Sequence, residues 1–351
     1  MKRLSMFASL FCALALQGFA QNNTVAGMYV LQFPGQDLRP VTKYIMNQPA
    51  VRGGNIFVVW SQVDGGNGQY DWSTVDNQIT SWAAIHKPVN LIVWGVNQMI
   101  PNTGTPSYVV NDPSFQSVTC ATRGTIATYP IYYSPGYKNN YKTFLAALLS
   151  RYGSDPRIGY IRTGLSRGGE VFPSCLTQMM QSSGTSLSQF NNIWQDYVAE
   201  ITAFQQGIPH TVQLMAALDQ YGWPTQFAVC DWEANNAVSL GFGFGSQGLQ
   251  LSDTLYPGGQ CSADWCAMFQ TYQGRVPLEL QTISASDPSN LQGGTGSLTV
   301  LLPFGLSLGA QVFEIYVQDW QIAYDPTSPN YASYGGVYQA VFQQTQVALG
   351  Y

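Results

Sequence analysis

The stretch IGYIRTGLSRGGE, residues 158–170, begins as an apolar run typical of a buried strand and ends on a glutamate, Glu170. A second stretch, VPLELQTIS (276–284), has the same strand-like character and carries Glu279 within it. Only 19 of the 351 residues are Asp or Glu. A carboxylate placed in an apolar strand costs several kcal/mol unless it is paired or has a function. The two glutamates are therefore the first candidates for functional residues.

Apolar runs of this kind recur along the whole chain. Near-continuous runs rich in Val, Ile and Leu are typical of parallel strands that are buried on both faces. Eight of them predict strands, at residues 25–32, 54–62, 89–96, 158–166, 211–218, 240–245, 276–284 and 310–318. Segments with helical spacing or helix start and stop signals lie between them, at residues 73–86, 139–153, 188–207, 262–274, 297–309 and 335–350.

This alternation predicts an α/β protein with a single (β/α)₈ TIM barrel over residues 21–351. A doubly wound parallel sheet is the alternative architecture. No Gly/Pro/Ser-rich linker or low-complexity run divides the chain into two domains. The 42-residue segment 97–138 interrupts the alternation; its aromatic content, including TYPIYYSPGY (128–137), predicts an ordered loop.

The first 20 residues predict a signal peptide. Lys2 and Arg3 precede the apolar run 4–16, and Gly18-Phe19-Ala20 offers a cleavage site after Ala20. We therefore expect a secreted or periplasmic protein without a membrane span. In such a compartment one or two disulfides are expected, Cys120 with Cys175 and Cys261 with Cys266 or Cys230 being the suggested pairs.

Composition narrows the classes of partner. The net charge of −5 and the 14 Lys and Arg residues argue against nucleic acid. Two histidines and no CxxC spacing give no zinc motif, so neither a metal nor another cofactor is implied. The sequence does not define the oligomeric state.

Two carboxylates at one barrel mouth match the requirements of glycosidic cleavage. On a barrel, Glu170 follows the fourth strand and Glu279 lies in the seventh, so both are expected at the C-terminal end, where active sites form. One carboxyl would protonate the leaving oxygen while the other attacks the anomeric carbon or activates water. For a retaining enzyme the two carboxyl groups are expected roughly 5–5.5 Å apart.

The chain resembles the clan of retaining (β/α)₈ glycoside hydrolases, in particular its β-galactosidase-like members. The resemblance rests on the two glutamate stretches and on VVWSQVDGGNGQYDWSTVDNQITSWA (58–83). It implies that Glu170 is the acid/base, that Glu279 is the nucleophile and that the substrate is an oligo- or polysaccharide. Two features depart from the clan: Gly169 stands where it has an Asn that binds the sugar 2-hydroxyl, and LGFGFGSQG (240–248) lacks its usual Tyr.

Further polar and aromatic residues are candidates for contact with the sugar, since pyranose rings stack on aromatic faces. The predicted substrate-binding residues are Trp60, Trp94, Arg162, Gln281 and Trp320, the last because the resemblance implies a Trp at the eighth strand; the tyrosines of the long segment (Tyr129, Tyr132, Tyr133 and Tyr137) are further candidates. A buried hydrogen bond is an equally good interpretation of Arg162 and Gln281. Core packing is an equally good interpretation of each aromatic residue alone. Glu314 is a third strand carboxylate, which we expect to pair with Arg162 or Arg167 inside the barrel.

Two other functions are compatible with parts of the sequence. Gly164-Leu165-Ser166-Arg167-Gly168 matches the G-x-S-x-G elbow of serine esterases, but it lacks a following helix and a late histidine. A barrel that binds carbohydrate without cleaving it is the second alternative, and both Gly169 and the missing Tyr in residues 240–248 favour it.

Overall fold

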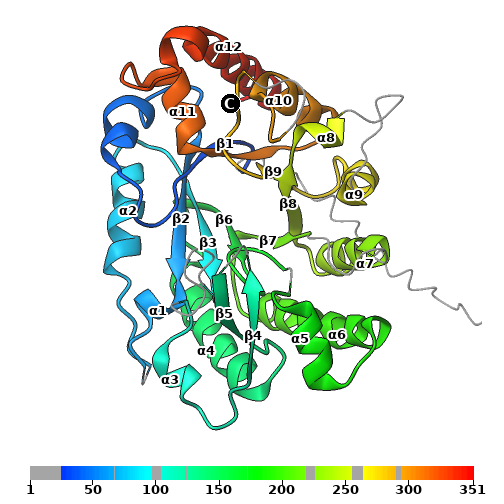
Figure 1. The fold of residues 1–351 in the computed structure, drawn as a ribbon. Helices are drawn as coiled ribbons and strands as arrows, with labels where there is room; N and C mark the ends of the chain where they lie inside the picture. Colours follow the sequence, from blue (N-terminus) through cyan, green and yellow to red (C-terminus); the bar gives the residue numbers. More distant parts are fainter. Residues whose placement is uncertain are drawn as a thin grey trace, which may run out of the picture.

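The computed structural model confirms the (β/α)₈ barrel. It describes residues 25–66, 68–96, 104–122, 125–171, 173–218, 226–254, 264–289 and 294–351. Each of the eight expected strands is present, and all pair in parallel in a closed barrel (Figure 1). Going round the barrel, they are β1 (Gly27–Leu31), β2 (Gly53–Val59), β3 (Val89–Trp94), β6 (Ile158–Thr163), β7 (Gln213–Ala217), β8 (Gly243–Leu249), β9 (Leu278–Thr282) and β10 (Val312–Tyr316).

Helices surround the strands on the outside, as Figure 1 shows. The six expected helices are α2 (Ser73–Ala83), α4 (Pro135–Tyr152), α6 (Leu187–Gln206), α9 (Asp264–Tyr272), α10 (Leu298–Ser307) and α12 (Tyr331–Leu349). Three further helices were not predicted from the sequence: α5 (Leu176–Ser183), α7 (Gln226–Ser239) and α11 (Val317–Tyr324). Four short helical turns were not predicted either: η1 (Val41–Ile45), α1 (Trp60–Val63), α3 (Ser107–Val110) and α8 (Leu251–Thr254).

The long segment between β3 and α4 is ordered where the structure describes it. It contains α3 and an antiparallel hairpin formed by β4 (Ser117–Thr122) and β5 (Thr125–Pro130). A disulfide joins Cys120 in β4 to Cys175 at the start of α5, with Cα atoms 5.6 Å apart, which confirms the suggested pair. The hairpin is thereby tied to the segment that follows β6 and Glu170.

The other cysteines are only partly described. Cys266 is disulfide-bonded, Cys230 is buried in α7, and Cys261 lies outside the described residues.

The expected signal peptide, residues 1–20, lies outside the described residues and stays a prediction. Among the helices that the structure describes, none combines the length and apolar character needed to cross a membrane.

The barrel interior is layered along its axis. An apolar layer closes the N-terminal end and consists of Val25, Tyr29, Tyr160, Met215 and Val312. A second layer lies near the C-terminal end and consists of Leu31, Val59, Ile92 and Trp94, with Phe33, Phe57 and Tyr316 packed against it. Buried charged side chains of Arg162, Glu279 and Glu314 extend from strand residues inside the barrel. These charges and the second layer set the environment of the candidate site.

Candidate functional site

Glu170 is held by a tight turn directly after β6. Its backbone carbonyl accepts hydrogen bonds from the amides of Leu165 (2.9 Å) and Ser166 (3.0 Å). Gly168 adopts a φ of +68°, and its amide donates to the carbonyl of Val96, beyond the end of β3, at 2.8 Å. These bonds fix the loop at the C-terminal end of the barrel and leave the Glu170 residue partly exposed.

The charge of Glu170 acts on phenol groups around it. Burial raises the pKa of Tyr316, at the end of β10, to about 12, and the negative charges of Glu314, Asp319 and Glu170 add to this. The pKa of Tyr132 is likewise raised, mainly by burial, with a further contribution from Glu170. Glu170 therefore lies within electrostatic reach of the end of β10, on the far side of the mouth from its own strand.

Glu279 lies deeper. It is the second residue of β9 and has no exposed surface. Its Oε2 accepts a 2.8 Å hydrogen bond from the Gln247 amide and lies 4.0 Å from Nε of Arg162. A Cβ atom on Gly245, its register partner in β8, would lie 1.9 Å from this Oε2. The glycine in β8 is therefore required by the carboxylate opposite.

Glu314 forms the strong ion pair of the interior. Its Oε2 accepts from Nη2 of Arg162 at 2.6 Å, and its Oε1 accepts from the Tyr160 hydroxyl. Burial raises the pKa of Glu314, and Arg162 opposes that rise. The expected pairing of Glu314 with Arg162 is confirmed. One guanidinium thus faces two carboxylates, from β9 and β10.

Arg162 also explains why residue 169 is glycine. Its Nη1 donates to the carbonyl of Gly169 at 3.2 Å. A Cβ atom at this position would lie 2.7 Å from Cγ2 of Ile92 and 3.3 Å from Nη1 of Arg162. The space beside the residue preceding Glu170 is already filled, so an asparagine there would require its neighbours to move.

An aromatic cluster lies at the C-terminal end of the barrel interior. Phe33 packs against Phe57 and Tyr316, with ring centroids 5.0 and 5.6 Å apart, and Phe57 packs edge-on against Trp94 at 4.7 Å. The Gln281 amide donates to the Tyr316 hydroxyl at 3.3 Å. We call Phe33, Phe57, Trp94, Gln281 and Tyr316 the mouth cluster; Phe33, Phe57 and Tyr316 are partly exposed.

Of the mouth cluster, only Trp94 and Gln281 are among the residues predicted from the sequence. Phe33, Phe57 and Tyr316 were missed, although a signal for them exists. Phe57 and Tyr316 stand two residues from inward-facing Asn55 and Glu314, and Phe33 stands two residues beyond Leu31. The two-residue period of strands would have placed all three inside the barrel.

The three predicted substrate-binding tryptophans are all buried: Trp94 lies in the mouth cluster, and the other two are core residues that pack against outer helices. Trp60 begins α1 rather than ending β2, is fully buried, and packs against Tyr141 and Phe144 of α4. Trp320 lies in α11, equally buried, 4.2 Å in centroid distance from Phe342 of α12. Each ring fills space between the barrel and its helices, which leaves it no surface for a sugar.

Arg162 and three of the four loop tyrosines are also unavailable to a sugar, whereas Tyr133 is partly exposed. Arg162 is 1% exposed and its guanidinium is engaged by Glu314. Tyr129, Tyr132 and Tyr137 are fully buried, and Tyr132 packs against Tyr137 and Trp194. The aromatic residues of the long segment therefore anchor it to α4 and α6 rather than forming a sugar platform.

The esterase interpretation is not supported by the geometry. Ser166 is buried, and its hydroxyl donates to the Glu170 carbonyl at 3.2 Å. The two histidines of the chain, His86 and His210, shortly precede β3 and β7 and so lie at the opposite end of the barrel. Ser166 therefore has no histidine to activate it.

A further buried carboxyl connects the segment after β9 to α11. Asp319 is fully buried and accepts hydrogen bonds from the Ser286 amide (2.9 Å) and hydroxyl (2.6 Å). The Ser286 hydroxyl also bonds to that of Tyr338 in α12. Burial raises the pKa of Asp319 to about 7, and the two bonds from Ser286 oppose the rise.

Comparison with known proteins identifies the fold. No protein-family model matches the chain, and no curated protein matches it in sequence. Among solved structures, it is similar to the β-galactosidase from Bacillus circulans sp. alkalophilus, with a TM-score of 0.58 and 12% identity over 93% of this chain and 57% of that enzyme. The β-galactosidase from the psychrophilic Marinomonas ef1 gives 0.52 and 14%, over 83% and 54%.

The chain spans little more than half the length of these two β-galactosidases. At identities of 12% and 14%, the similarity shows that it shares their barrel fold. Because one barrel fold supports many chemistries, function has to be argued from the site itself.

The interior ion pair yields a stability prediction. We expect Arg162→Met to destabilise the protein by about 3–5 kcal/mol, because it leaves Glu279 and Glu314 buried without their cation. Adding Glu314→Gln to this variant should recover part of the loss, since one uncompensated charge is then removed. Urea denaturation of both variants measures the effect. Arg39→Met, which breaks an exposed pair with Asp37, is the control and should change stability little; an equally small effect at Arg162 would contradict the account.

Asp319 yields a pH prediction. The unfolded chain releases this proton near pH 3.8 and the folded chain near pH 7, so the carboxyl destabilises the fold increasingly as pH rises through this range. We expect Asp319→Asn to gain stability relative to wild type by roughly 2–3 kcal/mol between pH 5 and pH 8. Urea midpoints at both pH values test this. Asp37→Asn is the control: Arg39 lowers the pKa of that carboxyl, so any effect should have the opposite sign.

Proposed function

We propose that this chain is a glycoside hydrolase that cleaves a β-linked carbohydrate with retention of configuration. The observation that carries the proposal is the position of Glu170. Glu170 is a partly exposed residue in the loop that follows the fourth barrel strand, at the end of the barrel where active sites form, and its charge acts on Tyr316 of the mouth cluster. The resemblance of its stretch and of the β9 stretch to retaining glycosidases supports the same assignment.

In this mechanism Glu170 starts as a carboxylic acid and Glu279 as a carboxylate. Glu170 gives its proton to the glycosidic oxygen while an Oε of Glu279 attacks the anomeric carbon, and the bond to the leaving group breaks. Water then attacks the anomeric carbon, passes a proton to Glu170 and releases Glu279. The polar groups next to Glu279 are the Arg162 guanidinium, 4.0 Å away, and the Gln247 amide, which donates a hydrogen bond to it.

The mouth cluster supplies suitable contacts for a sugar. Partly exposed rings of Phe33, Phe57 and Tyr316 offer apolar faces to pyranose C–H groups, while the Gln281 amide and the Tyr316 hydroxyl offer polar atoms. A mostly apolar surface with a few placed polar groups is typical of small-molecule sites.

A carbohydrate-binding barrel without catalysis is the second candidate, and three observations favour it. Glu279 has no exposed surface, so a sugar reaches it only if its neighbours move. The next inward-facing residue towards the mouth is Gln281, an amide that cannot act as the nucleophile. Gly169 supplies no side chain to the sugar 2-hydroxyl.

Substitution of the two glutamates distinguishes these functions. We expect Glu170→Gln and Glu279→Gln each to lower kcat/KM on activated aryl β-glycosides by about 10²–10⁴-fold, because each removes a group that acts only in the reaction. Glu200→Gln, at a helix-surface pair with Lys138 and Lys142, is the matched control and should retain activity.

Unchanged hydrolysis in both variants would show that the assignment is wrong. Wild-type protein whose melting temperature rises with oligosaccharides, but which releases no product from any of them, would establish the binding function instead.

A further inference from the structure

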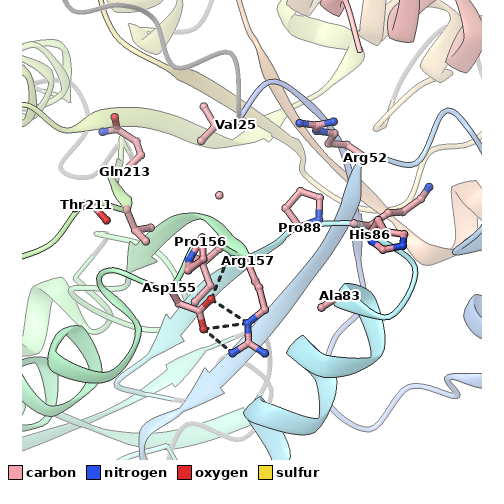
Figure 2. A pocket seen from close by; sticks show the side chains of 14 residues that line it. Val25, Arg52, Ala83, His86, Pro88, Asp155, Pro156, Arg157, Thr211 and Gln213 are labelled. Atoms are coloured by element: carbon pink, nitrogen blue, oxygen red, sulfur yellow. Dashed lines mark hydrogen bonds and ion pairs between the residues drawn. The ribbon is translucent and has the colours of Figure 1, made fainter.

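A cavity lies at the N-terminal end of the barrel, away from Glu170. It has a volume of about 570 Å³. Its lining comes from Val25 and the residues that lead into β2, β3, β6 and β7, with Ala83 of α2 at one side (Figure 2). The apolar layer of Tyr29, Tyr160, Met215 and Val312 lies inside the barrel beneath this end. The cavity is therefore separate from the proposed active site.

The lining of this cavity carries more positive than negative charge. Arg52, Lys87 and Arg157 line it together with His86, whereas Asp155 is its one carboxylate. Asp155 is already engaged: its carboxylate accepts from the guanidinium of Arg157 at 2.6 Å, as the dashed lines in Figure 2 show. The remaining cations, Arg52 and Lys87, form no ion pair with any residue that the structure describes.

Arg52 and Lys87 are close enough to repel one another. Partial burial, and then the charge of Arg52, lowers the pKa of Lys87 to about 8. Lys87 is held by the backbone carbonyls of Gln48, at 2.7 Å, and Val51. Neutral carbonyls stabilise a cation but do not remove the repulsion between two of them, so a bound anion would relieve it.

The Arg52 side chain is held in place but has donor capacity left. Its guanidinium lies over the ring of Tyr351, 5.6 Å from the centroid, and also faces the Tyr29 hydroxyl. Its Nε is buried and, among the described residues, has no hydrogen-bond partner. A guanidinium fixed in this way suits an oxyanion, which can accept two hydrogen bonds from its planar fork.

We propose that this cavity is a binding site for a small oxyanion, of the phosphate, sulfate or carboxylate class, with Arg52 as its main ligand and Lys87 as the supporting charge. The Thr211 hydroxyl stands on the opposite wall as a neutral hydrogen-bonding group (Figure 2). Because the site lies at the end of the barrel opposite the mouth, its occupancy stabilises the fold without touching Glu170 or Glu279. The proposal is independent of the proposed function.

Titration with inorganic phosphate tests the site. At constant ionic strength, set with sodium chloride, we expect phosphate to raise the melting temperature of the full chain in a saturable manner. Sulfate and glucuronate should act likewise, whereas glucose, which carries no charge, should not. Arg52→Gln should weaken phosphate binding at least tenfold. Arg275→Gln is the control, because Arg275 packs over Tyr272 outside the cavity and its loss should leave the affinity unchanged.

A second variant keeps the test decisive if Arg52→Gln does not fold. Ala83→Glu leaves Arg52 in place and adds a carboxylate to the cavity wall, so it should abolish the phosphate effect. The proposal is overturned if phosphate gives no saturable shift in wild type, or if the Ala83→Glu protein binds phosphate as wild type does. Equal phosphate affinity in Arg52→Gln and Arg275→Gln would overturn it as well.

Discussion

The guanidinium of Arg162 is the interaction on which the interior of this barrel depends. From β6 it reaches Glu314 on β10 at 2.6 Å, Glu279 on β9 at 4.0 Å and the carbonyl of Gly169 at 3.2 Å. Three strands and the loop that carries Glu170 therefore meet at one positive charge. Two buried carboxylates are tolerable at this depth because this cation and the polar groups of Tyr160 and Gln247 surround them.

The same charge shapes the candidate site. By bonding to Gly169, Arg162 fixes the backbone next to Glu170 and fills the space that a side chain at residue 169 would need. The glycine that departs from the glycosidase pattern is thus the counterpart of an arginine on β6. Above it, the mouth cluster offers aromatic faces, and Glu170 is a partly exposed acid whose charge acts on Tyr316 of that cluster. The barrel therefore has one partly exposed acid at its mouth, Glu170, and one fully buried carboxylate deeper inside, Glu279.

The architecture could be predicted from the sequence because eight strands buried on both faces leave long apolar runs with helices between them. The hairpin of β4 and β5 left no such run, because Ser or Thr interrupts it at residues 117, 119, 122, 125 and 128. Trp60 was misplaced because β2 ends at Val59, so that the next residue enters a helix and turns outward. For Glu279, the alternation of strand residues predicts an inward side chain, but its depth depends on where β9 begins and how the barrel is tilted. A sequence period does not contain that information.

Covalent trapping tests the central claim, that Glu279 is the nucleophile of a retaining hydrolase, most directly. The protein would be incubated with a panel of 2-deoxy-2-fluoro β-glycosides carrying activated leaving groups, which slow the second step and let the glycosyl-enzyme accumulate. The trapped protein would then be digested with a protease and analysed by mass spectrometry. The account predicts one sugar per chain, on the peptide that contains Glu279, and none on Glu279→Gln. A sugar attached to any other carboxylate would contradict it, as would stoichiometric trapping that persists in Glu279→Gln.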